Sequence, residues 1–181
     1  IARREGIGDI LAEGVLRAAQ RIGKGAEHYA MHTKGMELAA YEPRAAKAHG
    51  MNYATSPIGG SHCYGYARQE IFWATIPRPV DRFADSGKGD IVVFNQRERA
   101  THELGILCGF STGGVMNNQL MGELLAAATG FDDFADVAYL EKVAERSLVL
   151  ERAFIVREGF DRKDDTLPLR MLTEPLENAS R

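Results

Sequence analysis

Apolar residues recur every three or four positions along most of this chain, and stretches containing glycine or proline separate these periodic segments. Such spacing places the apolar side chains on one face of a helix, so each segment is predicted to be helical. We expect about five helices, over residues 10–22, 45–55, 91–107, 115–128 and 134–157. Residues 30–38, where Gly35 interrupts a loose alternation, predict an extended segment or at most a short hairpin. The pattern therefore favours an all-α fold.

Two stretches lack this periodicity. Residues 67–90 contain prolines, glycines and many charged side chains, which is typical of an irregular surface loop. Residues 161–170 alternate in charge and include Pro168, and on their own they predict a solvated turn. We therefore expect neither stretch to contribute to the core.

Composition and charge narrow the function classes without indicating an activity. The 181 residues are 45% hydrophobic and 26% charged, which is ordinary for a globular protein. The net charge of −3 comes with no basic block, so nucleic acid is not an expected partner. No apolar run approaches the about 18–20 residues of a membrane span, and two cysteines give no disulfide framework. We expect a cytoplasmic protein without a membrane partner. The chain begins at Ile1 in mid-pattern, which indicates a part of a longer protein.

Cys108 ends the predicted 91–107 helix and follows an apolar stretch, so we expect its thiol to point into the protein. Free cysteine is among the most buried residue types, and residue type alone favours a small core residue. The alternative is a soft metal ligand, because cysteine thiolates hold iron–sulfur clusters. One cysteine cannot hold a cluster, so the other ligands would have to lie outside this chain.

The segment from residue 58 to 66 contains three glycines, Gly59, Gly60 and Gly65, which would allow the backbone to approach a ligand closely. His62 lies among them on a predicted loop. It is either a structural histidine or a proton donor and acceptor, since histidine titrates near neutral pH. Pattern and composition support only the suggestion that this loop and Cys108 line one site.

Several segments resemble the aldehyde ferredoxin oxidoreductase family, and they occur in the family's order from Gly6 to Pro175. The matching segments are residues 6–15, 34–38, 41–44, 53–56 and 150–168. The resemblance implies an all-α chain made of the C-terminal helical domains of such an enzyme. Residues 1–44 would be the end of its second helical domain, and residues 45–181 would be its third, C-terminal domain.

The resemblance also implies an activity. Family members hold tungsten, sometimes molybdenum, between two pterins beside a [4Fe–4S] cluster, oxidise aldehydes to carboxylic acids, and pass electrons to ferredoxin. Expected partners are therefore a small aldehyde, ferredoxin, the enzyme's N-terminal domains and further copies of the enzyme in a homo-oligomer. This fragment alone should hold neither cofactor and should be inactive. Alternatives are another oxo substrate, such as a carboxylic acid or an aromatic thioester, or a non-catalytic helical domain that mediates subunit contacts.

Candidate site residues follow from the same resemblance. In the family, an Asp-x-x-Gly-Leu motif that binds pterin precedes the fourth cluster cysteine. Residues 102–106 occupy the place of this motif, with His102 for its aspartate, and Cys108 matches the cysteine although it stands three residues after Gly105 instead of two. His102, Gly105, Ile106 and Leu107 are therefore candidate cofactor-binding residues. His62 matches a histidine beside the metal, with a role in proton transfer or substrate orientation. We expect both sites in one cavity, with His62 on the substrate side and Cys108 deeper.

Overall fold

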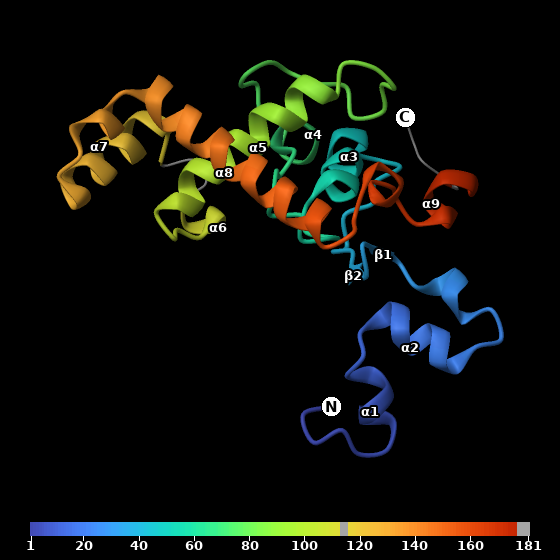
Figure 1. Ribbon diagram of the computed structural model, residues 1–181. Helices are drawn as coiled ribbons and strands as arrows, with labels where there is room; N and C mark the ends of the chain where they lie inside the picture. The colour runs from blue at the N-terminus through green and yellow to red at the C-terminus, as the bar shows by residue number, and fades with distance from the viewer. Residues whose placement is uncertain (113–115, 177–181) are drawn as a thin grey trace.

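The computed structural model describes residues 1–112 and 116–176. The described part holds nine α-helices, three 3₁₀ helices and one two-stranded hairpin (Figure 1). In chain order they are α1 (Ile7–Leu11), α2 (Val15–Ile22), η1 (Ala26–Tyr29), β1 (His32–Thr33), β2 (Met36–Glu37), α3 (Lys47–Thr55), α4 (Arg68–Ile71), α5 (Gly89–Leu104), α6 (Gly109–Thr112), α7 (Asn118–Thr129), η2 (Asp132–Ala135), α8 (Val137–Arg157), η3 (Arg162–Asp164) and α9 (Leu169–Thr173).

The mostly helical fold expected from the sequence is confirmed. In the described part, five helices have eight residues or more, namely α2, α3, α5, α7 and α8, and each overlaps one periodic segment. Residues 30–38, expected to be extended or at most a short hairpin, do form a short hairpin, with His32 paired to Glu37 in antiparallel register. The predicted start of the fourth helix at Val115 lies outside the described residues.

The prediction of one continuous helix over residues 10–22 is wrong, because the chain breaks at Gly14. Gly14 has a φ of 79°, a left-handed conformation that glycine adopts without a steric penalty. The α2 helix then begins at Val15, whose backbone N–H donates to Oε1 of Glu37 at 2.6 Å. This carboxylate on β2 satisfies one of the free donors at the N-terminus of α2 and ties that helix to the hairpin.

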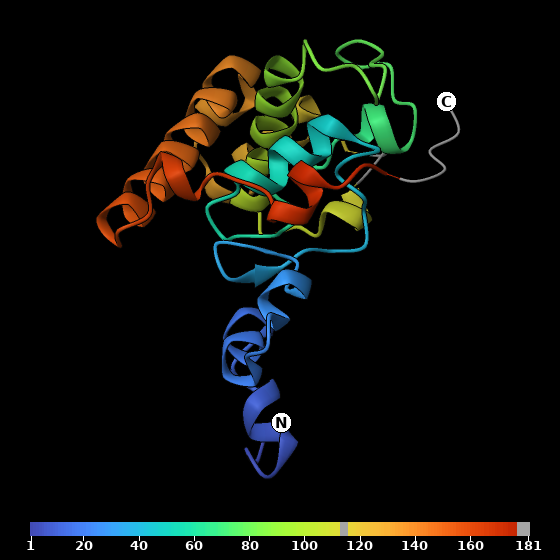
Figure 2. The same cartoon turned by 90° about the vertical axis from the view of Figure 1, so that its right-hand side faces the viewer.

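The body of the molecule is built around α5. The long helix α8 packs along α5, and α3 also packs against α5 (Figures 1 and 2). Helix α7 and the short η2 that follows it pack together next to the N-terminal end of α8. Buried apolar side chains mark the contacts: Ile91 and Val92 of α5 cluster with Ala48 of α3, and Leu140 of α8 is also buried. Helix α3, which precedes the loop that contains His62, is therefore held against α5.

The first 31 residues form an arm that projects from this body in both views (Figures 1 and 2). The arm exposes large apolar side chains, namely Ile1, Ile7, Leu11, Ile22 and Tyr29. An isolated globular protein rarely leaves so many on one short segment. The arm thus presents a surface that another part of a larger assembly could cover.

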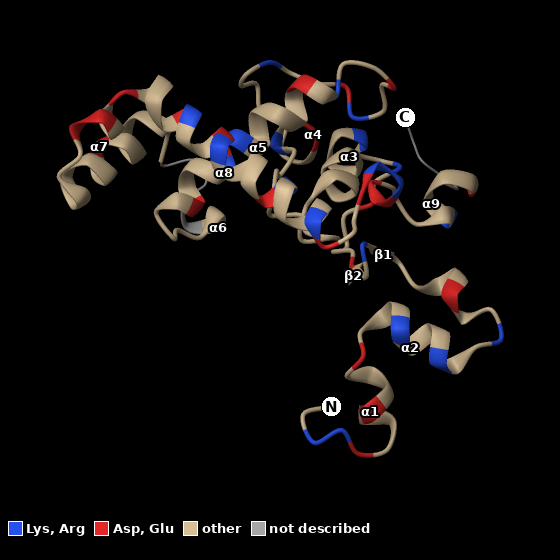
Figure 3. Ribbon diagram, viewed as in Figure 1, with Lys and Arg blue, Asp and Glu red and all other residues tan. Residues whose placement is uncertain are grey.

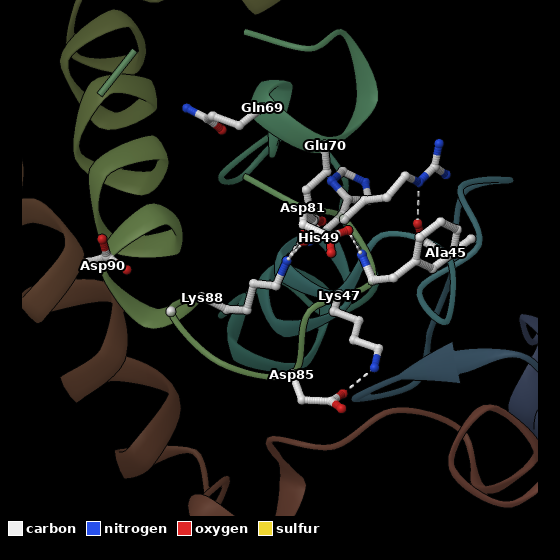
Figure 4. A network of polar contacts seen from close by, with 12 residues as sticks. Ala45, Lys47, His49, Gln69, Glu70, Asp81, Asp85, Lys88 and Asp90 are labelled. Atoms are coloured by element: carbon white, nitrogen blue, oxygen red, sulfur yellow. Dashed lines mark hydrogen bonds and ion pairs between the residues drawn. The ribbon is translucent and has the colours of Figure 1, made fainter. Parts of the chain in front are cut away.

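The prediction that residues 67–90 form an irregular surface loop is wrong near both ends of this segment. Glu70 on α4 is 0% exposed and Lys88 is 4% exposed, and their side chains form a buried ion pair (Figure 4). The Lys88 ammonium also donates to the carbonyl of Asp81, and Glu70 accepts the backbone N–H of His49 at 3.1 Å. Charge alone predicts exposure, but here each charged group is buried together with its partner.

The prediction of a solvated turn over residues 161–170 is wrong at Asp165. This carboxylate lies 2.9 Å from the Lys34 ammonium and 2.9 Å from the Arg152 guanidinium, and it is mostly buried. The hydroxyl of Thr33 also donates to the carbonyl of Thr166. The tail therefore fastens the hairpin to the C-terminal end of α8.

Basic and acidic positions are interspersed along the ribbon (Figure 3). This distribution agrees with the absence of a basic block in the sequence. Among the described helices, none combines the length and the apolar character that crossing a membrane would require.

Candidate functional site

His62 lies within a group of aromatic rings. It belongs to the loop that follows α3, and it is half-buried. Its ring centroid lies 5.4 Å from that of Tyr41, 5.8 Å from that of Tyr66 and 6.1 Å from that of Phe110. Burial disfavours the charged imidazolium and so lowers the pKa of His62. The imidazole is therefore neutral at pH 7, and it has one proton to give and one nitrogen to accept another.

The neighbouring cysteine contacts this histidine. Sγ of Cys63 lies 3.4 Å from Nε2 of His62, and the Cys63 backbone N–H donates to the Ser61 hydroxyl at 3.2 Å. Burial raises the pKa of the Cys63 thiol, and the nearby Arg99 opposes this only in part. The thiol thus stays protonated and can donate to Nε2. Reasoning from the sequence missed Cys63, although its position directly after His62 was the available signal.

The glycines of this loop allow close backbone packing within the protein. A Cβ built on Gly60 would lie 2.6 Å from the carbonyl oxygen of Glu37, and one on Gly59 would lie 2.6 Å from that of Thr33. A Cβ on Gly65 would overlap Asn52 and Gln96. The glycines let the loop pack against the hairpin, α3 and α5, and so they fix the backbone around His62.

The expectation that Cys108 points into the protein, deeper than His62, is wrong. Helix α5 ends at Leu104, and the Cys108 thiol is exposed. The reason lies in Ile106, which has a φ of 56° and a side chain that is 94% exposed. A left-handed residue after the helix reverses the chain direction, so Cys108 emerges on the surface between α5 and α6.

Replacing Ile106 by glycine is expected to stabilise the protein by about 1 kcal/mol. A left-handed conformation costs an L-residue about 1–2 kcal/mol, and the added backbone freedom of glycine in the unfolded chain offsets part of the gain. The side chain is exposed, so its removal loses no burial. Thermal unfolding measures the effect. The matched control is Ile58→Gly, where an exposed isoleucine has no positive φ and the melting temperature should fall. A lower melting temperature for Ile106→Gly would contradict this account.

The other candidate cofactor-binding residues differ in how far they are exposed to solvent. His102 on the last turn of α5 is 5% exposed, and burial lowers its pKa. Glu103 beside it is exposed and accepts a hydrogen bond from Nε of Arg99 at 3.1 Å. Gly105 and Leu107 are half-buried, and the carbonyl of Leu107 also accepts from Arg99. The exposed polar group at this helix end is therefore the Glu103 carboxylate.

A cavity of about 410 Å³ opens beside these segments. Cys63, Tyr66 and Phe110 line it, and so does Gly109. His62 and Cys108 are not in the lining, but Cys63 and Gly109 are their next neighbours in the chain. Since Phe110 contacts the His62 ring, the structure brings the His62 loop and the segment after Cys108 to one side of the molecule.

A second histidine, His49, is buried against the aromatic rings that surround His62. His49 on α3 is 0% exposed, its Nδ1 accepts the backbone N–H of Ala67 at 3.3 Å, and no protein group in the described part bonds its Nε2. Its ring packs edge-on against Tyr41, Tyr53 and Tyr66. Burial, with a smaller contribution from His62, lowers the pKa of His49 to about 4. His49 is thus a neutral member of the aromatic core.

This burial predicts acid sensitivity. The pKa of a histidine in an unfolded chain is about 6.5, whereas folding holds that of His49 at about 4. As the pH falls from 6.5 to 4, the unfolded chain binds a proton that the folded chain does not, so the free energy of unfolding decreases. The loss from this group reaches at most about 3 kcal/mol. Urea titrations between pH 7 and pH 4.5 would measure it. His49→Phe should flatten the slope, and an unchanged slope would contradict the assignment.

The described residues include no group of three or more His, Cys, Asp and Glu side chains that could together hold a metal ion. A metal at this site would thus need ligands in addition to those that the described residues bring together.

Comparisons with known proteins place these features in context. A family model described as "Aldehyde ferredoxin oxidoreductase, domains 2 & 3" matches residues 1–181. The tungsten-containing aldehyde ferredoxin oxidoreductases of Pyrococcus abyssi and Pyrococcus horikoshii are each 40% identical over 178 residues, or 97% of this chain. The aliphatic sulfonate oxidoreductase, WOR-like subunit, of Pyrococcus furiosus is 30% identical over 187 residues. The chain spans 28% of the length of the first two relatives and 26% of the third.

Proposed function

Because this chain belongs to the aldehyde ferredoxin oxidoreductase family, we propose that the enzyme containing it oxidises aldehydes to carboxylic acids and passes two electrons to ferredoxin. The observation that carries the proposal is the match of the family model to every residue of the chain. The relatives are much longer, so the other domains of the same protein would complete the enzyme. On this proposal the chain alone is inactive, and the intact enzyme forms a homo-oligomer.

We place a domain boundary near residue 44. Residues 1–44 would complete the second helical domain, and residues 45–181 would form the third. The projecting arm supports this division, because its exposed Ile7, Leu11 and Ile22 need a neighbouring surface to cover them. The arm connects to the body through the β1–β2 hairpin and its contact with α2.

Cys108 would be one ligand of the [4Fe–4S] cluster, and the rest of the enzyme would supply the others. An exposed thiol fits this role better than a buried one, because a cluster shared between domains must lie at the surface of each. Thiolates are the usual ligands of such clusters. The exposure that contradicts a core cysteine thus supports a ligand.

The backbone also favours a register for the pterin motif that is shifted by one residue from residues 102–106, the register that the sequence resemblance implies. With Glu103 at the aspartate position, the motif's glycine falls on Ile106, and Cys108 follows at the family's spacing. Ile106 has the left-handed φ that favours glycine, whereas Gly105 has a φ of −88°. We therefore assign the motif carboxylate to Glu103, which is exposed, in place of the buried His102. The backbone of Ile106 and Leu107 would remain part of the pterin contact.

When bound, the tungsten (or molybdenum) bis-pterin would supply oxygen-atom and two-electron chemistry, with the cluster as the electron exit. The role of this chain would be to accept a proton and to orient the substrate. Sγ of Cys63 lies 3.4 Å from Nε2 of the neutral His62 ring, so the thiol contacts one of the two ring nitrogens. The neutral imidazole of His62 would accept a proton from the reacting group, and the rings of Tyr41, Tyr66 and Phe110 would hold it in place.

A second candidate is oxidation or reduction of another oxo substrate by the same machinery. The similarity to a protein described as an aliphatic sulfonate oxidoreductase subunit supports this second candidate. A carboxylic acid or an aromatic thioester would be alternative substrates of this kind. The residues assigned above would keep their roles, and only the assay substrate would differ.

The test uses the intact enzyme purified without oxygen. Tungsten and iron content are measured, together with aldehyde-dependent reduction of ferredoxin. Cys108→Ser is expected to lose iron, whereas the matched variant Cys63→Ser is expected to keep it, because Cys63 is partly buried against His62. An enzyme without metal or activity toward any of these substrates would instead indicate a domain for subunit contacts. If Cys108→Ser retained as much iron as Cys63→Ser and the wild type, Cys108 would not be a cluster ligand.

A further inference from the structure

The 410 Å³ cavity beside His62 has a size typical of small-molecule sites. Three of its lining residues contact His62: the Cys63 thiol lies at 3.4 Å from Nε2, and the rings of Tyr66 and Phe110 lie within 6.1 Å between centroids. A molecule in the cavity would therefore lie against the residues that hold the imidazole. The cavity therefore adjoins the proposed proton-transfer site across these three residues.

Each charged side chain in the lining has an oppositely charged partner within the protein, although Nη1 of Arg99 is buried without a hydrogen-bond partner in the described part. Arg68 forms an ion pair with Glu98, and both belong to the wall. Arg99 donates to the Glu103 carboxylate at 3.1 Å. Asn95 exchanges hydrogen bonds with the Gln69 side chain. Because these ion pairs leave the wall without net charge, it favours uncharged ligands.

The rest of the lining is aromatic or apolar. Phe72 stacks on Tyr66 with centroids 5.6 Å apart and an angle of 18° between the ring planes. Phe110 meets Tyr66 edge-on at 6.2 Å, and Ala74 completes this wall. Phe72 and Phe110 are both more than half exposed, although aromatic side chains usually bury most of their surface. Two exposed phenylalanines facing one cavity form a wall that an aromatic ring can complete.

We infer that this cavity holds the organic group of the substrate and that it selects uncharged aryl aldehydes over short aliphatic or phosphorylated ones. The inference rests on the proposed function, because it takes the carbonyl end of the substrate to lie toward His62. Phe110 and Phe72 would be the specificity-determining residues. Ala74 would set the depth of the cavity.

The experiment compares kcat/KM of the intact enzyme for benzaldehyde, acetaldehyde and glyceraldehyde 3-phosphate. The wild-type enzyme should prefer benzaldehyde to the other two. Phe110→Ala and Phe72→Ala should each lower the ratio of benzaldehyde to acetaldehyde at least about tenfold, because they remove one face of the aryl site. Ala74→Leu should lower the same ratio by filling the cavity. Phe110→Tyr should keep it, and Phe131→Ala, at an equally exposed ring near η2, is the matched control and should leave it unchanged.

Three outcomes separate the possible failures. A wild-type enzyme that oxidises none of the three aldehydes refutes the proposed function itself. An active enzyme whose ratio stays within twofold in Phe110→Ala, Phe72→Ala and Ala74→Leu overturns only the aryl site. If the Phe110 and Phe72 variants instead lose tungsten or iron, or separate the domains, the cavity is covered by another part of the enzyme and the inference is also overturned.

Discussion

Replacing Glu70 by glutamine should lower the free energy of unfolding of this domain by about 3–5 kcal/mol. The substitution removes the carboxylate charge that faces the Lys88 ammonium, which is 4% exposed, and leaves it the neutral oxygens of the glutamine amide and the Asp81 carbonyl. Taking such a charge out of water costs several kcal/mol when no opposite charge compensates it. Because Glu70 also accepts the backbone N–H of His49, the loss should spread to α3 (Figure 4). Hydrogen exchange of the α3 and α5 amides in the intact enzyme measures it.

Two controls make this prediction specific to the buried pair. Glu70→Leu combined with Lys88→Met removes both charges and should recover most of the loss, since apolar residues of similar size often replace buried ion pairs without penalty. Glu145→Gln breaks a similar pair with Arg97, but both side chains are about half exposed. That substitution should change stability by less than about 1 kcal/mol. Equal effects at Glu70 and Glu145 would mean that burial does not govern the strength of the pair.

The long helices could be predicted from the sequence because each repeats its apolar face over several turns. Helix α8 buries Leu140 and Ala144 at helical spacing, and the pattern extends over 21 residues. Helices α4, α6 and α9 have only four or five residues, too few for a period to be recognised. Gly14 illustrates a different limit. A glycine inside a periodic segment is compatible with an unbroken helix, and only the φ of 79° decides that the helix restarts there.

The buried charges could not be predicted, because each partner comes from a distant part of the chain. Lys34 and Asp165 meet at 2.9 Å although one follows β1 and the other follows η3. Read locally, Asp165 lies in a polar, proline-containing tail, which predicts solvation. Its burial follows from the packing of the tail against the hairpin. The same reasoning explains why Lys88 was expected at the surface.

The candidate site was predictable in its residue types but not in its geometry. The sequence indicates His62 and Cys108, and the structure brings Phe110, two residues after Cys108, against the His62 ring. The outward direction of Cys108 depends on Ile106 in a left-handed conformation, which a β-branched residue rarely adopts. Apolar neighbours predict burial of Cys108, and only the backbone at Ile106 shows that the chain turns outward.

Replacing His62 by alanine should lower the turnover of the intact enzyme by about 10²–10⁴-fold if this residue transfers a proton. The loop backbone should stay in place, because Gly59 and Gly60 pack against the hairpin whatever side chain stands at position 62. Iron and tungsten should therefore be retained, in contrast to Cys108→Ser. His28→Ala, at an exposed histidine that contacts Glu174, is the matched control and should leave turnover unchanged.

The pH dependence separates proton transfer from a structural role. Burial lowers the pKa of His62 below the ordinary value of about 6.5, so the free enzyme keeps a neutral imidazole down to more acidic pH. The acid limb of kcat/KM in the wild type should therefore lie below pH 6.5, and it should disappear in His62→Ala because the titrating group is gone. His62→Gln keeps a side chain in the ring cluster but transfers no proton, so it should be as slow as alanine. Turnover close to wild type in the glutamine variant would show that His62 only orients its neighbours.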